Sequence, residues 1–218
     1  MVQTKVKICC ISSIAEAMMA MHYGADAIGL VGKMPSGPGL IEDELIRSIA
    51  IEIPPPIATF LLTSEIAAEQ IIAHHKRTFT NTIQLVDELP EKEYAIIKEA
   101  IPAIKLVQVI HVIDEGSVEE AIKVSAHVDA ILLDSGNPKL AIKELGGTGR
   151  VHDWKLSRKI KESIKIPLFL AGGLNATNVR QAIDEVDPYA VDVCSGVRTN
   201  GLLDENKLKA FFEGARRL

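Results

Sequence analysis

Two segments near the end of the chain decide its fold: Leu170-Ala171-Gly172-Gly173-Leu174-Asn175 and Val191-Asp192-Val193-Cys194-Ser195-Gly196. Each is an apolar run of strand length that ends in small residues, and Asn175 is suited to cap a helix after the first run. Glycines between a strand end and a helix start let backbone N–H groups approach an anion, which the helix dipole also favours. Two such units in succession are typical of the phosphate site after strands 7 and 8 of a (β/α)8 barrel. The sequence therefore predicts a phosphorylated small molecule as the ligand.

Short apolar runs alternate with helix-periodic stretches along the whole chain. The predicted strands span residues 6–11, 26–32, 57–63, 82–87, 105–112, 128–135, 167–173 and 190–196. The predicted helices span residues 14–22, 42–51, 65–76, 91–100, 117–125, 154–163, 178–185 and 205–217. This strict alternation favours a parallel eight-stranded sheet closed into one (β/α)8 TIM barrel, with residues 1–218 as a single domain. An open doubly wound sheet is the alternative, but no Gly-x-Gly-x-x-Gly follows the first strand.

Composition and charge narrow the class of protein. The formal net charge of −5 gives no general attraction to nucleic acid or to an anionic membrane, so we expect neither as a partner. The cysteines are Cys9, Cys10 and Cys194, and their odd number predicts reduced thiols rather than a disulfide framework. The sequence shows no signal peptide and no segment long enough to span a membrane. We therefore expect a cytoplasmic protein, either a monomer or a homodimer.

The residues suited to chemistry lie at the carboxyl ends of the predicted strands. Side-chain alternation puts Lys7 and Cys9 on one face of the first strand and apolar Ile8 on the other, so Lys7 and Cys9 should point into the barrel. Asp134 ends the sixth strand and could face Cys9 across the barrel mouth. A thiolate and a carboxylic acid are a workable base and acid for moving a proton next to a carbonyl or imine.

Each of these residues also has a simpler structural interpretation. A buried free cysteine is usually a small apolar filler, an aspartate at a strand end often caps the next turn, and paired glycines can be turn residues only. We expect Cys10 and Cys194 to be packing residues, and His111 to be a structural histidine. No spacing of His, Cys and Asp indicates a metal site.

Several segments, taken together, resemble the phosphoribosylanthranilate isomerases, enzymes of tryptophan biosynthesis that are built on a (β/α)8 barrel. The matching segments are spread over almost the whole chain, in the order of the family: Val6-Lys7-Ile8-Cys9, residues 24–31, Gln84-Leu85, Leu132-Leu133-Asp134-Ser135, Gly146-Gly147-Thr148-Gly149, Asp153-Trp154, residues 170–178 and residues 191–197.

The resemblance implies an aldose–ketose isomerase, an intramolecular oxidoreductase of amino-acid biosynthesis, that performs an Amadori rearrangement of N-(5-phosphoribosyl)anthranilate. By position, Asp134 would be the general acid that opens the ribose ring, and Cys9 the general base that removes the C2 proton. The resemblance also implies a set of residues that bind the substrate and its phosphate: Gly147, Gly149, Gly172, Gly173, Ser195 and Gly196. It implies no cofactor and no metal.

The chain departs from the family pattern where the aromatic acid should be recognised. The glycine that usually follows the catalytic cysteine is Cys10. Residues 33–40 replace a Ser-Pro-Arg-like motif and contain no arginine, so Lys33 could contribute only a point charge to a carboxylate. Gln84 is retained, but Val86 stands where the family has a histidine.

These departures leave two alternatives open. One is the same chemistry on a different phosphorylated sugar. The other is a non-catalytic barrel that binds a phosphorylated metabolite. Lys7, Lys33 and Gln84 are possible further site residues in either case.

Overall fold

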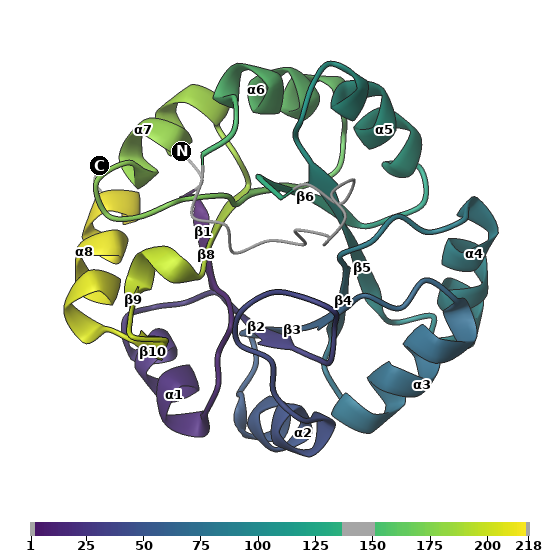
Figure 1. The fold of residues 1–218 in the computed structure, drawn as a ribbon, viewed down its shortest axis with the longest axis horizontal. Helices are drawn as coiled ribbons and strands as arrows, with labels where there is room; N and C mark the ends of the chain where they lie inside the picture. Colours follow the sequence, from purple (N-terminus) through teal and green to yellow (C-terminus); the bar gives the residue numbers. More distant parts are fainter. Residues whose placement is uncertain (1–2, 137–150, 217–218) are drawn as a thin grey trace.

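The structure is a computed structural model that describes residues 3–136 and 151–216. Within these ranges eight parallel strands form a closed barrel in chain order, and helices surround it (Figure 1). The strands are β1 (Lys5–Ile8), β2 (Ala27–Val31), β3 (Ala58–Thr63), β4 (Thr82–Leu85), β5 (Lys105–His111), β6 (Ala130–Asp134), β7 (Leu168–Leu170) and β8 (Ala190–Val193). The helices are α1 (Ile14–His22), α2 (Asp43–Glu52), α3 (Ala68–Thr78), α4 (Glu91–Ala100), α5 (Gly116–Val124), α6 (Trp154–Ser163), α7 (Val179–Val186) and α8 (Glu205–Arg216). The predicted (β/α)8 barrel is confirmed.

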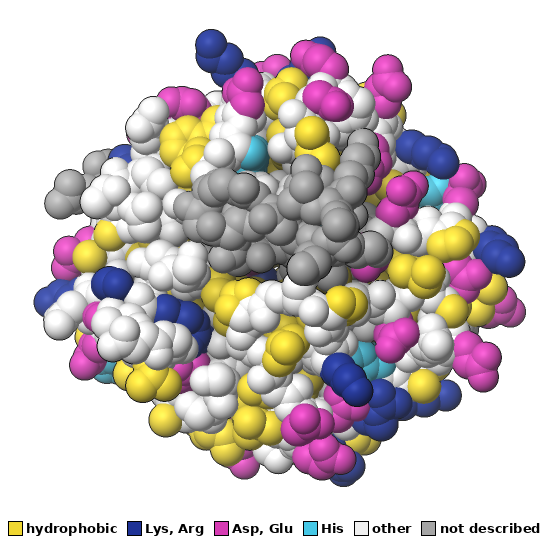
Figure 2. All heavy atoms as spheres, viewed as in Figure 1, with side chains coloured by type: hydrophobic (Ala, Val, Ile, Leu, Met, Phe, Trp, Pro, Cys, Tyr) yellow, Lys and Arg dark blue, Asp and Glu magenta, His cyan; other side chains and the backbone are white. Residues whose placement is uncertain are grey.

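Side-chain alternation along the strands divides the apolar residues into two cores. Residues such as Ile8 and Leu30 point outward and form a large cluster with the helices. Their neighbours Cys9 and Val31 point inward and form a smaller cluster inside the barrel. The first strand closes the barrel against the last, with Lys7 in register with Asp192. Figure 2 shows the end-on view as spheres, with charged side chains around the rim and apolar side chains nearer the centre.

The carboxyl end of β7 comes earlier than the sequence predicts. The predicted strand runs to residue 173, whereas the observed strand ends at Leu170. Gly172 and Gly173 have φ angles of 82° and 64°, and this left-handed backbone cannot continue a strand. The helix that follows begins at Val179, one residue after the predicted start, but its N-cap residue is Asn178 rather than Asn175. The glycine pair therefore forms a loop, which is the property that phosphate binding needs.

A short hairpin after β8 was not predicted. A 3-10 turn, η1 (Ser195–Val197), leads into β9 (Arg198–Thr199), which pairs antiparallel with β10 (Leu202–Leu203). The two residues between the strands, Asn200 and Gly201, have φ angles of 52° and 81°, as expected for the Asn-Gly loop of a two-residue hairpin. The hairpin brings residues 198–203 back toward the start of the chain.

No helix in the described parts of the chain combines the length and apolar character needed to cross a bilayer.

Candidate active site

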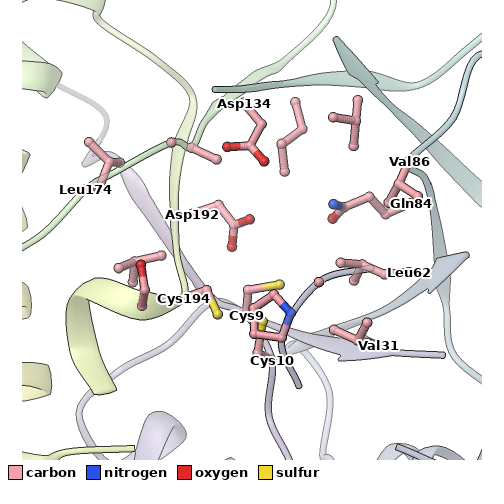
Figure 3. Close-up of a pocket in the computed structure, with 18 of the residues that line it drawn as sticks. Cys9, Cys10, Val31, Leu62, Gln84, Val86, Asp134, Leu174, Asp192 and Cys194 are labelled. Carbon is pink, nitrogen blue, oxygen red and sulfur yellow. The ribbon is translucent and has the colours of Figure 1, made fainter. Parts of the chain in front are cut away.

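A pocket opens at the carboxyl ends of the barrel strands (Figure 3). Most of the predicted site residues that the structure describes line it: Cys9, Gln84, Asp134, Gly172, Gly173 and Ser195. Cys9, directly after β1, and Asp134, at the end of β6, come from opposite sides of the pocket, and both side chains point into it (Figure 3). The sequence-based expectation that these two residues face one another across the barrel mouth therefore agrees with the geometry.

Beneath the pocket lies a buried ion pair. Lys7 Nζ is 3.0 Å from Asp192 Oδ1, and the two side chains are 0% and 7% exposed. Lys7 Nζ also lies 5.0 Å from the centroid of the Phe60 ring. Burial works against the charge of Lys7, but the carboxylate of Asp192 outweighs it and raises the pKa of the ammonium. Lys7 therefore supplies a permanent positive charge under the reacting groups.

The Cys9 thiol is placed by a close approach of two strands. A side chain at Gly29 would have its Cβ 2.8 Å from Cys9 Sγ and 3.1 Å from Lys7 Nζ, so only glycine leaves room at this position of β2. A hydrogen bond with the Cys10 thiol lowers the pKa of Cys9 in spite of its burial, and the Lys7 ammonium acts in the same direction. Both effects favour the thiolate, which is the form that can accept a proton.

Asp134 has the opposite electrostatic environment. The residue is buried, and its Oδ1 accepts a hydrogen bond of 2.8 Å from the Ser135 amide. Burial, together with the nearby carboxylate of Asp192, raises the pKa of Asp134 to about 6. The pocket therefore holds one group whose pKa is shifted toward proton donation and one whose pKa is shifted toward proton acceptance.

The loops after β7 and β8 pack directly against each other. A Cβ at Gly196 would lie 1.9 Å from the carbonyl oxygen of Leu174, so no side chain fits between them. In the first loop, the Asn178 side chain donates to the Gly173 carbonyl at 3.0 Å and accepts from the Asn175 amide at 2.8 Å. Ser195 is exposed at the start of the second loop. These contacts hold two backbone segments in the arrangement expected of a phosphate cradle.

The pocket has two unlike walls. We call Cys9, Asp134 and Asp192, together with Lys7, which lies beneath them and does not line the pocket, the polar wall; they come from β1, β6 and β8 or directly follow these strands. The opposite, apolar wall consists of Val31, Leu62, Val86 and Val109, from the ends of β2 to β5. Of the predicted residues on this side, Gln84 points into the pocket, and its Oε1 has no hydrogen-bond partner among the described residues (Figure 3). Lys33 is exposed and does not line the pocket, although its neighbour Met34 does.

Three lining residues had no predicted role in the chemistry. Asp192 completes the ion pair with Lys7. Cys10 and Cys194, which we expected to be packing residues, both border the pocket. Cys10 has a φ of 61°, which is rare for a residue other than glycine. Hydrogen bonds with Cys194 and Cys9, together with burial, raise the pKa of the Cys10 thiol well above its usual range. One sequence signal for Asp192 exists: it is an acid in an otherwise apolar strand.

The remaining predicted features lie outside the pocket or outside the described residues. Gly147 and Gly149 belong to the part of the chain that the structure does not describe. His111 is buried at the end of β5 and lines a second cavity with Asp87 and Asp114. Within residues 3–136 and 151–216, no group of three or more His, Cys, Asp or Glu residues could hold a metal ion.

Comparisons with known proteins identify the family of the chain. Residues 6–214 match the family model described as N-(5'-phosphoribosyl)anthranilate (PRA) isomerase. N-(5'-phosphoribosyl)anthranilate isomerase 2 of Methanosarcina mazei is 37% identical over 214 residues, which cover 97% of this chain and 94% of the relative. The corresponding isomerase of Methanosarcina acetivorans is 35% identical over 228 residues, covering 99% of this chain and 94% of the relative.

Solved structures give the same result. Phosphoribosyl anthranilate isomerase from Thermotoga maritima superposes with a TM-score of 0.84 at 33% identity, covering 98% of each chain. A phosphoribosyl anthranilate isomerase solved with reduced 1-(o-carboxyphenylamino)-1-deoxyribulose 5-phosphate superposes with a TM-score of 0.81 at 31% identity, again over 98% of each chain. The barrel, its pocket and these matches together show that the chain belongs to the N-(5'-phosphoribosyl)anthranilate isomerase family.

Proposed function

We propose that the pocket catalyses the Amadori rearrangement of N-(5'-phosphoribosyl)anthranilate, with Asp134 as general acid and Cys9 as general base. The observation that carries this proposal is the pairing of a carboxyl whose pKa is raised to about 6 with a thiol whose pKa is lowered, on opposite sides of one pocket. An isomerisation that needs one proton donated and another removed is suited to such a pair. Membership of the family supports the choice of substrate.

In the first step, Asp134 donates its proton to the ring oxygen of the ribose. The bond between this oxygen and C1 then breaks, and the lone pair of the anthranilate nitrogen forms a C1=N iminium. The buried environment that raises the pKa of Asp134 keeps part of the population protonated near neutral pH. The ring opens because the leaving oxygen departs as a hydroxyl rather than as an alkoxide.

In the second step, the Cys9 thiolate removes the proton from C2. The electron pair of this C–H bond forms the C1=C2 double bond of an enolamine and neutralises the iminium nitrogen. Transfer of a proton to C1 and loss of the C2 hydroxyl proton then give the 1-deoxyribulose product. Every proton that is removed is replaced, so the reaction needs no oxidant or reductant.

Binding of the phosphate is assigned to the loops after β7 and β8. The left-handed backbone at Gly172 and Gly173, and the close contact of Gly196 with Leu174, favour exposure of N–H groups toward a shared anion. Gly147 and Gly149 remain proposed contacts beside the substrate. The aromatic ring would then lie against the apolar wall.

The apolar wall supports a second candidate substrate class. No arginine or lysine is among the described residues that line the pocket, so no cation there is placed to pair with an anthranilate carboxylate. The same acid and base could act on a phosphoribosylamine that lacks this carboxylate. Three free cysteines support a reducing, cytoplasmic setting for either substrate, with the chain acting as a single domain.

The test is a fluorescence assay of N-(5'-phosphoribosyl)anthranilate consumption by the wild type, Cys9→Ala and Asp134→Asn. We expect wild-type turnover, and a kcat lower by about 10²- to 10⁴-fold in each variant, with smaller changes in affinity. Arg158→Met removes an exposed ion pair on α6 and serves as the control that should leave kcat unchanged. N-phosphoribosylaniline, offered in parallel, separates the two substrate classes. Absence of turnover with both compounds at high enzyme concentration contradicts the proposal.

A further inference from the structure

A second buried ion pair lies outside the pocket, beside the loop after β1 that carries Cys9. Arg198 Nη1 and Glu16 Oε1 are 3.0 Å apart, and the side chains are 8% and 10% exposed. The two residues are 182 positions apart in the chain. Glu16 is in the first turn of α1, and Arg198 begins β9 directly after the loop that follows β8. The pair therefore joins the segment that follows the first strand of the barrel to the segment that follows the last.

The Glu16 carboxylate accepts hydrogen bonds from the segment before α1 and from the hairpin after β8. Its Oε2 accepts from the Ser12 amide at 2.9 Å and the Ser12 hydroxyl at 3.0 Å, while its Oε1 accepts from the Leu203 amide at 2.8 Å. The Glu16 amide is itself bonded to the Ser13 hydroxyl at 3.1 Å, the N-cap contact of α1. Burial opposes ionisation, but Arg198 and these amides lower the pKa of Glu16, so it stays a carboxylate.

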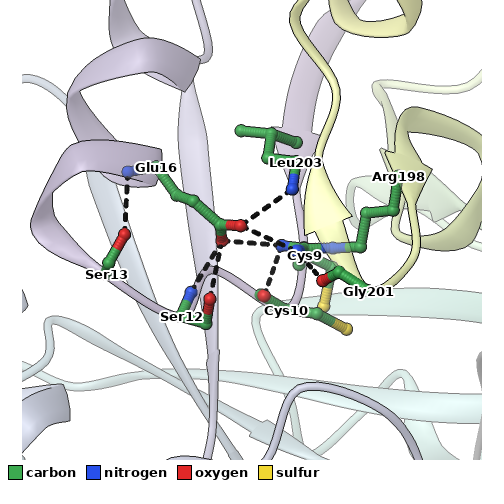
Figure 4. A network of polar contacts seen from close by, with 8 residues as sticks. All are labelled: Cys9, Cys10, Ser12, Ser13, Glu16, Arg198, Gly201 and Leu203. Carbon is green, nitrogen blue, oxygen red and sulfur yellow. Dashed lines mark hydrogen bonds and ion pairs between the residues drawn. The ribbon is translucent and has the colours of Figure 1, made fainter.

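Arg198 uses its remaining donors on the backbone next to the proposed base. Nη2 donates to the carbonyl of Cys10, and lies 3.4 Å from the carbonyl of Cys9, while Nη1 donates to the Gly201 carbonyl at 2.9 Å (Figure 4). One planar guanidinium therefore connects Glu16, the loop after β1 and the hairpin. A fork of this kind fixes the direction as well as the distance of each partner.

The backbone that Arg198 holds is the strained part of the loop. Cys10 has a φ of 61°, a conformation that costs free energy for any side chain and persists only where its surroundings impose it. In this conformation the Cys10 thiol is within hydrogen-bonding reach of Cys9 and contributes to the lowered pKa of the base. Release of the Cys10 carbonyl would let the residue relax and withdraw this donor.

We propose that Glu16 and Arg198 are positioning residues for the reaction, which clamp the loop after β1 to the segment after β8 and so fix the Cys9 thiol beside the phosphate cradle. The inference rests on the proposed role of Cys9. Neither residue lines the pocket, so the clamp acts through the backbone of residues 9 and 10 and through residues 198–203. It makes the position of the base depend on the loop that is assigned to the phosphate.

The experiment uses Arg198→Met, Arg198→Lys and Glu16→Gln in the full chain. The main readout is the pH dependence of Cys9 alkylation by iodoacetamide, resolved from Cys10 and Cys194 by fragmentation mass spectrometry. For Arg198→Met we expect the alkylation midpoint of Cys9 to move to higher pH, and kcat to fall roughly 10- to 100-fold with a rise in KM. Arg198→Lys keeps the charge without the fork and should recover only part of kcat.

Arg216→Met is the matched control. Arg216 donates to the Gly24 carbonyl and lies 3.6 Å from Asp26, so it is also an arginine that joins a carbonyl and a carboxylate, but before β2 at the opposite end of the barrel. It should lower the melting temperature without moving the Cys9 titration. An unchanged Cys9 titration in the variants at positions 16 and 198 overturns the inference, whatever their melting temperatures. Failure of the proposed function is distinct, since a wild type without turnover still gives a Cys9 titration to compare.

Discussion

The polar wall and the apolar wall of the pocket are built on different principles. On the polar wall, charged groups hold one another: Lys7 pairs with Asp192 at 3.0 Å, and both affect the neighbouring acid and base. On the apolar wall, Val31, Leu62, Val86 and Val109 provide nonpolar surface but no hydrogen-bonding groups that would orient a ligand. Groups that must sit within fractions of an ångström of a reacting atom need such mutual constraint, whereas an aromatic ring needs only a fitting shape. Substrate scope can therefore change on one wall without disturbing the chemistry on the other.

The largest expected effect is on the polar wall. Lys7→Met should lower the free energy of unfolding by about 3–5 kcal/mol, because it leaves the Asp192 carboxylate buried and unpaired. Urea unfolding measures this change as a lower midpoint with an unchanged slope. Lys105→Met is the control: its pair with Asp129 has a 66% exposed lysine and should contribute less than about 1 kcal/mol. Equal losses in the two variants would remove the distinction between a buried and a surface pair.

The next effect concerns the contact between the two loops that we propose to bind the phosphate. Gly196→Ala places a methyl group against the Leu174 carbonyl, so the loops must separate, at a cost of about 1–3 kcal/mol. We expect this cost mainly in substrate binding, as a rise in KM of roughly 5- to 150-fold. Gly201→Ala provides the comparison, since its φ of 81° strains an added side chain, whereas Gly196 is outside the left-handed region, and nothing lies within 4 Å of the added Cβ. A KM that rises equally in both variants would argue against packing of the loops as the cause.

The pH dependence of kcat/KM tests whether the acid and base work together. Below the pKa values of both groups Asp134 is protonated, while the Cys9 thiolate becomes scarcer, so the rate should fall about tenfold per pH unit. Above the pKa of Cys9 the thiolate is complete and protonated Asp134 becomes scarcer, so the rate should fall again. In Asp134→Asn the residual rate should rise to the Cys9 pKa and then stay level. A fall at high pH that survives in this variant would assign it to another group.

The smallest effect is expected on the apolar wall. Val86→Ala removes two methyl groups from the surface assigned to the aromatic ring, which costs about 1 kcal/mol, or roughly fivefold in KM. The kcat and the alkylation midpoint of Cys9 should remain those of the wild type. Ile122→Ala, on the exposed face of α5, should change neither KM nor kcat. A marked loss of kcat in Val86→Ala would mean that the two walls are coupled.

The sequence was sufficient for features that depend on local periodicity. Alternation of side chains along the first strand predicts that Lys7 and Cys9 face inward, and the structure agrees. Small residues at strand ends, Gly172-Gly173 and Ser195-Gly196, predict the loops after β7 and β8 in the same way. The Asn200-Gly201 pair was an equally local signal for the hairpin, and it was missed because the segment was assigned to a connection between a strand and a helix.

Features that depend on register or on distant partners could not be predicted. Asp192 meets Lys7 only because β8 pairs with β1 in one particular register. The left-handed backbone of Cys10 and its contact with Arg198 depend on a loop 188 residues away. His74 of α3 is buried between Thr63 of β3 and Asp43 of α2, a placement that depends on how three elements pack.

The pairing of β1 with β8 has a consequence for folding. Cys9 directly follows β1, whereas Asp192 lies in β8, the last strand of the barrel, and Arg198 follows it. A refolding intermediate that lacks β8 has the base but neither the counter-ion of Lys7 nor the guanidinium that holds the loop. Recovery of turnover during refolding should therefore coincide with docking of β8. The time course of enzymatic activity would then report when the barrel closes.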